Sequence, residues 1–162
     1  MQTNFKLKTI YLVFDGLELD LHTFYSFTGL EYSVEHRTLK LNWWLGPIDP
    51  EDKQWIKDTW PMKIQIEFTD VSVFEFRPRD PEIPFSEDDC MQTAGYRSGA
   101  EWCNDVLLPN EAPDPDWQIA FEFRSGALIA VQAECGTARA LTENTGPTKQ
   151  IRHRLRRSDN LA

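Results

Sequence analysis

Acidic side chains gather in one stretch of the sequence, residues 80–116, and their carboxylates are the groups best suited to bind something. The stretch holds ten Asp or Glu residues against a single Arg. Such a set can receive an Arg-rich partner or a divalent cation, but its spacing does not fit a calcium loop, which needs a glycine at its sixth position. Alternatively, these acids only cap and solubilise a surface loop. The predicted partner-binding carboxylates are those of Asp80, Glu82, Glu87, Asp88 and Asp89.

The side chains that could act as a base or a nucleophile form no recognisable motif. The three histidines, His22, His36 and His153, include no pair at HxH or HxxxH spacing. Cys103 could be a nucleophile only beside an imidazole, and a lone cysteine is more often a small buried apolar residue. GxSxG, Walker A and GxGxxG motifs are absent. We predict no catalytic residue, no metal site and no cofactor, which favours a protein that is not an enzyme.

The C-terminal segment carries the opposite charge. The run KQIRHRLRR places five Lys or Arg residues within nine positions, and residues 137–162 carry six basic and two acidic side chains. With a net charge of −9 for the whole chain, residues 1–136 carry −13. A body this acidic repels nucleic acid and anionic lipid. We expect no membrane partner, and nucleic-acid contact only through a flexible basic tail, residues 147–162.

Length and composition favour one domain. A chain of 162 residues with 12% aromatic residues can bury a core without staples. The apolar runs are too short to span a membrane, and the N-terminus is read as a first strand because it lacks the long apolar segment of a secretory signal. Three cysteines without CxxC spacing suggest neither a disulfide framework nor a zinc site. These features predict a reduced cytoplasmic protein with a single domain over residues 1–146, and they leave homo-oligomerisation open.

Alternating apolar and polar residues predict a β-hairpin over residues 117–135. A three-residue loop, 124–126, pairs Phe121 with Ile129 and places Gly126 where a bulged hairpin needs a left-handed residue. A two-residue turn would instead bring Gln132 onto the apolar face, because a slip of one residue turns every side chain over. We therefore predict the longer loop. The outer face of this hairpin is not fully hydrophilic, and we expect partial cover over Ala120, Leu128 and Ala130.

The rest of the chain also favours strands. A phase change near Arg37 indicates a tight hairpin rather than a bulge. Residues 17–30 are ambiguous, with a strand ended by Gly29. Alternation and turn residues predict further strands over 7–14, up to the Asp15-Gly16 turn, and over 62–68 and 71–76.

Short helices are predicted at two places. One spans 50–60, with Asp49 as its cap and a stripe formed by Trp55, Ile56 and Trp60. We expect this helix to cover Trp44, which points away from the core face that carries Trp43. An exposed Trp44 would mark a contact surface, so it joins the candidate partner-binding residues. The other helix opens at Ser86, with Asp89 completing a capping box.

The predicted fold is mainly β: an antiparallel curved sheet or half-open barrel with one or two short helices, or alternatively a β-sandwich. The acidic insertion 78–116 contains six of the ten prolines and is expected to be packed. No motif identifies a family, although in size and composition the chain resembles the small acidic bacterial proteins that neutralise toxins by binding them.

The sequence thus ranks three hypotheses for the function. The first is a non-catalytic protein-binding module that engages a basic partner through the acidic segment. The second is a small-molecule or hydrolytic pocket on the sheet, where His36 or Cys103 meets a carboxylate. The third is nucleic-acid contact through the basic tail.

Overall fold

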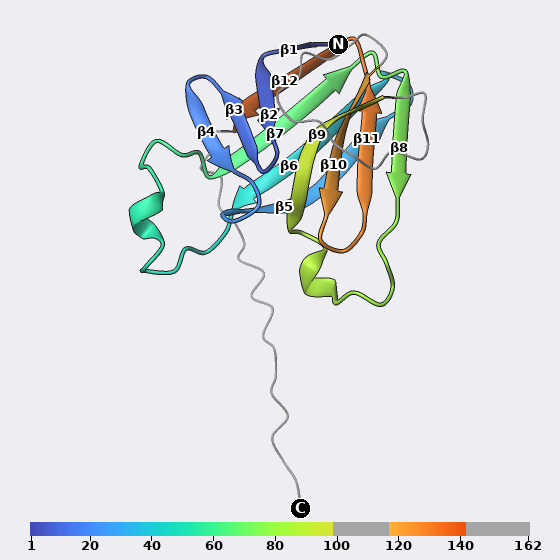
Figure 1. The fold of residues 1–162 in the computed structure, drawn as a ribbon. Coiled ribbons are helices and arrows are strands. Elements are labelled where there is room, and N and C mark those ends of the chain that lie inside the picture. The colour runs from blue at the N-terminus through green and yellow to red at the C-terminus, as the bar shows by residue number, and fades with distance from the viewer. Residues whose placement is uncertain (99–116, 142–162) are drawn as a thin grey trace, which may run out of the picture.

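The computed structural model describes residues 1–98 and 117–141, and almost all regular structure in this part of the chain is strand (Figure 1). Two single 3-10 turns, η1 (Lys53–Trp55) and η2 (Phe85–Glu87), interrupt it. The strands are β1 (Gln2–Thr3), β2 (Phe5–Lys8), β3 (Tyr11–Phe14), β4 (Leu17–Asp20), β5 (Tyr25–Ser33), β6 (Thr38–Leu45), β7 (Lys63–Thr69), β8 (Val73–Arg77), β9 (Met91–Ser98), β10 (Trp117–Phe123), β11 (Leu128–Gln132) and β12 (Cys135–Ala140).

These strands form three sheets. The five-stranded sheet has the order β1-β12-β7-β6-β5, the four-stranded sheet the order β8-β11-β10-β9, and β2, β3 and β4 form a meander. All pairs are antiparallel except β1 with β12. The predicted mainly β class is confirmed.

The two larger sheets face each other across an aromatic core. The ring of Trp43 on β6 lies 5.5 Å from that of Phe121 on β10, and the ring of Phe27 on β5 lies 4.8 Å from that of Phe123. Both layers are visible in Figure 1. Aligned packing of two inner faces is the arrangement of a sandwich, so the four- and five-stranded sheets take the form that the sequence left as its alternative.

The two layers are joined along one side and open along the other. The N-terminal segment pairs with β12 of the five-stranded sheet through β1, and Thr9 then bridges to Ala94 on β9 of the four-stranded sheet. On the opposite side, β5 and β8 end their sheets and are not hydrogen-bonded to each other. Within residues 1–98 and 117–141 no sheet closes on itself, and the whole keeps the half-open character that was predicted.

The β10–β11 hairpin has the predicted register. Phe121 pairs with Ile129, and the amide of Phe123 donates to the carbonyl of Ala127 at 2.9 Å. Gly126 adopts a φ of +79°, the left-handed conformation that the three-residue loop requires. Inward-facing side chains on both strands are fully buried. The expected cover over the outer face is also found, as a second buried cluster of Ala120, Leu128 and Ala130.

Three strand predictions need comment. The hairpin near Arg37 is confirmed, since β5 and β6 pair across a loop in which Arg37 has a φ of +48°. The single strand over 7–14 was wrong, because the chain turns at Thr9, with a φ of +59°, and forms β2 and β3. A β-branched residue in this conformation gives no turn signal in the sequence. Gly29 does not end β5 but lies at an irregularity within it.

The helix predicted over 50–60 was wrong in length and in what it covers. Only η1 forms, flanked by Asp52 rather than capped by Asp49, and Trp55 is 65% exposed. Trp60 instead packs on Phe24 and Tyr25, with ring centroids 5.6 and 6.2 Å away. These contacts outweigh the local helix propensity.

The second helix is likewise a single turn. It is η2, which begins at Phe85 after Pro84, one residue before the predicted start, and no side chain caps it. No helix within the described ranges is both long enough and apolar enough to cross a membrane.

Because Phe121 sits at the centre of the aromatic contacts between the sheets, we expect Phe121→Ala to lower the free energy of unfolding by about 3–5 kcal/mol, as measured by urea denaturation. The matched control is Phe85→Ala, since Phe85 is 80% exposed and contacts Arg79 through its ring. This control should cost about 1 kcal/mol or less. Equal losses in the two variants would contradict the packing described here.

Candidate functional site

The β8–β9 connection, residues 78–90, contains all five predicted acids and folds over the tip of the β10–β11 hairpin. The amide of Asp80 donates to the carbonyl of Ser125 at 2.7 Å. The amide of Arg124 donates to the carbonyl of Cys90 at 3.0 Å at the other end of the connection. This part of the insertion is therefore packed, as predicted, while residues 99–116 lie outside the described part of the chain.

Two of the five acids are neutralised within the fold. Asp88 accepts from the guanidinium of Arg79 at 2.8 Å, and Glu87 pairs with Arg124 at 3.0 Å. The carboxylate of Asp80 accepts from the amide of Glu82 at 2.9 Å, which is a local turn contact. Asp80, Glu82 and Asp89 have no cationic partner in the described residues. The uniform acidic patch that the sequence suggests is thus divided into paired and unpaired carboxylates.

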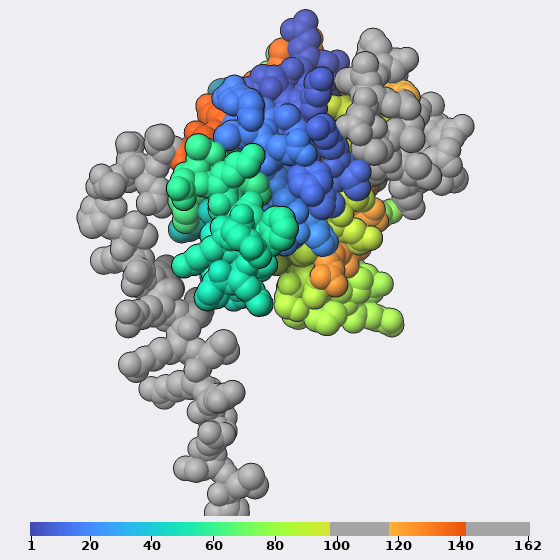
Figure 2. Space-filling model, turned by 60° about the vertical axis from the view of Figure 1, so that its left-hand side comes forward, coloured from blue at the N-terminus to red at the C-terminus, as the bar shows by residue number. Residues whose placement is uncertain are grey.

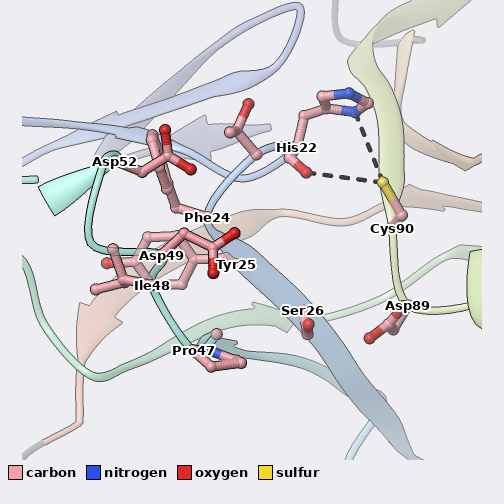
Figure 3. A pocket seen from close by; sticks show the side chains of 12 residues that line it. His22, Phe24, Tyr25, Ser26, Pro47, Ile48, Asp49, Asp52, Asp89 and Cys90 are labelled. Atoms are coloured by element: carbon pink, nitrogen blue, oxygen red, sulfur yellow. Dashed lines mark hydrogen bonds between the residues drawn. The ribbon is translucent and has the colours of Figure 1, made fainter. Parts of the chain in front are cut away.

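Asp89 lies at the edge of a depression of about 230 Å³, which we call the acidic cleft. Figure 2 shows its two sides as separate lobes, the β6–β7 connection in green and the β8–β9 connection in yellow-green. In Figure 3, Asp49 and Asp52 lie on one side of the cleft and Asp89 on the other. Asp49 and Asp52 also lack a cationic partner among residues 1–98 and 117–141. The cleft is lined by His22, Thr23, Phe24, Tyr25, Ser26, Gly46, Pro47, Ile48, Asp49, Asp52, Asp89 and Cys90.

The floor of the acidic cleft is rigid and aromatic. Tyr25 is buried, and burial raises its pKa, so its hydroxyl stays protonated and donates to the carbonyl of Pro61 at 2.8 Å. Phe24 packs edge-on against Trp60. The carboxylates therefore stand around a wall that does not itself titrate near neutral pH.

A histidine and a cysteine also meet in the acidic cleft (Figure 3). The Sγ of Cys90 lies 3.8 Å from Nδ1 of His22, but that nitrogen is only 2.7 Å from the carbonyl oxygen of Met91. A carbonyl can only accept a hydrogen bond, so this contact requires a proton on Nδ1. Nδ1 then cannot take the proton of the thiol, which points to the carbonyl of His22 at 3.7 Å.

The electrostatic environment of Cys90 also opposes a nucleophilic role. Burial raises the pKa of the Cys90 thiol, and the carboxylates of Glu87 and Asp89 raise it further, while Arg124 acts in the opposite direction. The thiolate is the reactive form, and reactive cysteines lie in electropositive surroundings. The pair is a contact between a thiol and an imidazole, without the activation that catalysis needs.

The catalytic pair proposed from the sequence is not assembled in the described residues. His36 is exposed in the loop between β5 and β6, and no carboxylate pairs with it there. Cys103, His153 and the basic tail 147–162 lie outside the described residues. Sequence reasoning missed the contact between His22 and Cys90 because 68 positions separate them and no local motif links them. The described part of the chain has no cluster of three or more metal-ligating side chains.

A second depression, the aromatic groove, lies on the other side of the β8–β9 connection. It has a volume of about 350 Å³ at the open side of the two sheets. Asp88 lines this groove while its neighbour Asp89 lines the acidic cleft. Ser125 is 0% exposed, and its hydroxyl has no hydrogen-bond partner in the described residues. The lining consists of Phe27, Phe76, Pro78, Arg79, Asp88, Phe123, Ser125, Ala127 and Ile129.

Trp44 lies apart from the acidic residues, and the prediction that a helix covers it was wrong. Its side chain is 42% exposed on the outer face of β6. The Nζ of Lys63 stands 4.4 Å from its ring centroid. Trp44 lines neither the acidic cleft nor the aromatic groove, so the structure does not bring the six predicted site residues into one surface.

Comparison with known proteins adds no assignment. No protein-family model matches this chain, and neither the curated proteins nor the solved structures give a significant match. The function therefore has to be argued from the acidic cleft and the aromatic groove.

Cys90 should be slow to alkylate because burial raises its pKa. In a Cys103→Ser background, we expect iodoacetamide at pH 7 to label the exposed Cys135 at least about tenfold faster than Cys90, with the Cys90 rate rising as the pH becomes alkaline. Arg124→Gln removes the charge that lowers this pKa and should slow Cys90 further. Peptide mapping by mass spectrometry gives both rates, and fast labelling of Cys90 at pH 7 would contradict our interpretation.

The unpaired hydroxyl of Ser125 should destabilise the fold. A buried hydroxyl without a partner costs about 1–3 kcal/mol, so we expect Ser125→Ala to raise the free energy of unfolding by about 1 kcal/mol in the absence of any ligand. Ser72→Ala is the control, because the exposed Ser72 hydroxyl donates to the carbonyl of Gln132 at 3.3 Å. Urea denaturation measures both changes. A clear loss of stability in Ser125→Ala would mean that the hydroxyl has a partner.

Proposed function

We propose that this protein is a non-catalytic binding module that holds a basic side chain of a partner protein in the acidic cleft. The observation that carries the proposal is the convergence of Asp49, Asp52 and Asp89, three carboxylates without cationic partners, on one depression. They come from two connections that are far apart in the sequence. A guanidinium or ammonium group placed between them would supply the missing positive charge.

The surroundings of the cleft favour this occupant. The chain carries a net charge of −9, and clefts lined by one sign of charge concentrate the field and draw in ions of the opposite sign. Phe24 and Tyr25 offer apolar surface for the aliphatic stem of an Arg or Lys side chain. An Arg suits a site with acceptors on two sides, because its planar group presents five donors.

The state of His22 and Cys90 supports binding rather than catalysis at this cleft. Nδ1 of His22 is committed to the carbonyl of Met91, and burial raises the pKa of Cys90. Neither group is prepared to transfer a proton or attack a carbonyl. Their place in the wall is explained by packing and by the local hydrogen bonds.

The test compares the tripeptide Gly-Arg-Gly with its neutral analogue Gly-citrulline-Gly, each titrated at low ionic strength and followed by amide chemical shifts. We expect Gly-Arg-Gly to shift the amides of residues 22–26, 49–52 and 89–90, and Gly-citrulline-Gly to shift them far less. Replacing Asp49, Asp52 and Asp89 together by Asn should weaken the Arg peptide by about tenfold, since each exposed charge pair contributes up to ~1 kcal/mol.

The matched control changes the net charge equally at acids outside the cleft, as Glu31→Gln, Glu35→Gln and Glu134→Gln. It should weaken binding by less than about twofold, because exposed charges farther apart than a Debye length of ~10 Å are screened. Equal weakening in both triple variants would reduce the interaction to non-specific attraction. Equal binding of the two peptides would overturn the proposal.

A further inference from the structure

The aromatic groove points to a second binding function that is independent of the acidic cleft. It lies where β5 and β8, the last strands of the two facing sheets, leave the core open. The side chains of Phe27, Phe123 and Ile129 form its apolar wall, and Phe76, on the edge strand β8, is 54% exposed beside it. A volume of about 350 Å³ falls within the range of small-molecule sites, roughly 300–1,000 Å³.

One polar atom in this groove lacks a partner. Ser125 belongs to the tip of the β10–β11 hairpin, which is usually exposed to solvent, but the β8–β9 connection covers it. Its backbone carbonyl accepts from the amide of Asp80, while its hydroxyl has no partner in the described residues. Buried polar atoms in native proteins nearly always have a hydrogen-bond partner, which is supplied by the protein, by water or by a ligand.

The charged side chains at the groove compensate each other. Arg79 donates to the carboxylate of Asp88 at 2.8 Å and to the carbonyl of Ile83. The guanidinium and the carboxylate are therefore committed within the connection, and the groove offers no net charge to a ligand. This distinguishes the aromatic groove from the acidic cleft, where the carboxylates are unpaired.

We infer that the aromatic groove binds a small neutral aromatic molecule that carries one hydroxyl or carbonyl group. The ring packs on the phenylalanine side chains, and the polar group forms a hydrogen bond with the hydroxyl of Ser125. Apolar walls with one placed polar group are the usual composition of a ligand site, in which the apolar area supplies affinity and the polar group sets the orientation.

The test uses phenol and toluene, which have nearly the same shape and differ in the hydroxyl. Both are titrated into the full chain, and binding is followed through the methyl signals of Ala127 and Ile129. We expect both molecules to shift these signals. The ratio of the toluene to the phenol dissociation constant should be about fivefold larger in the native protein than in Ser125→Ala, the effect of one hydrogen bond.

Two further variants complete the design. Ala127→Leu narrows the groove and should weaken both molecules, with its folding checked by circular dichroism. Ser26→Ala, which removes a hydroxyl from the acidic cleft, should leave both affinities unchanged. Absence of shifts at Ala127 and Ile129 up to the solubility limit, or the same ratio in Ser125→Ala as in the native protein, would overturn the inference. Either result leaves the proposed function of the acidic cleft untouched, because that test uses other residues and another probe.

Discussion

The contact between Trp43 and Phe121 is the interaction on which the rest of the structure depends. It joins the inner faces of the two larger sheets and therefore sets the phase of β6 and of β10 together. With that phase, Trp44 must lie on the outer face of one sheet and Ala120 on the outer face of the other. The open side between β5 and β8 follows as well, because the layers meet through large rings and are joined only along their opposite side.

The tip of the β10–β11 hairpin is the second organising point. Its carbonyl at Ser125 and its side chain at Arg124 hold the β8–β9 connection, which becomes the wall between the acidic cleft and the aromatic groove. Asp88 and Asp89 are adjacent along this wall and line different depressions. One turn in the sequence thus positions both candidate sites, and each site inherits the rigidity of a hairpin that is buried on both faces.

Periodicity was sufficient for the strands but not for the sites. The register of Phe121 with Ile129 could be predicted because one buried face and one glycine, Gly126, exclude the alternatives. The acidic segment was also identified correctly as packed up to residue 98. The cleft was missed because it joins Asp49 to Asp89 across forty positions, and local patterns carry no information on which connections pack together. Likewise, a Ser-Gly turn predicts exposure, so only the tertiary cover over Ser125 reveals a buried hydroxyl.

Charge within the acidic segment is sorted by ion pairs rather than by sequence position. Arg79 and Arg124 neutralise Asp88 and Glu87, the carboxylates nearest the apolar side chains of the fold, while Asp89 stays unpaired toward the cleft. A partly buried carboxylate needs a partner, since desolvation penalises the free charge, whereas an exposed one does not. The same physical constraint therefore makes the groove neutral and leaves the cleft anionic, so two neighbouring depressions recognise chemically different ligands.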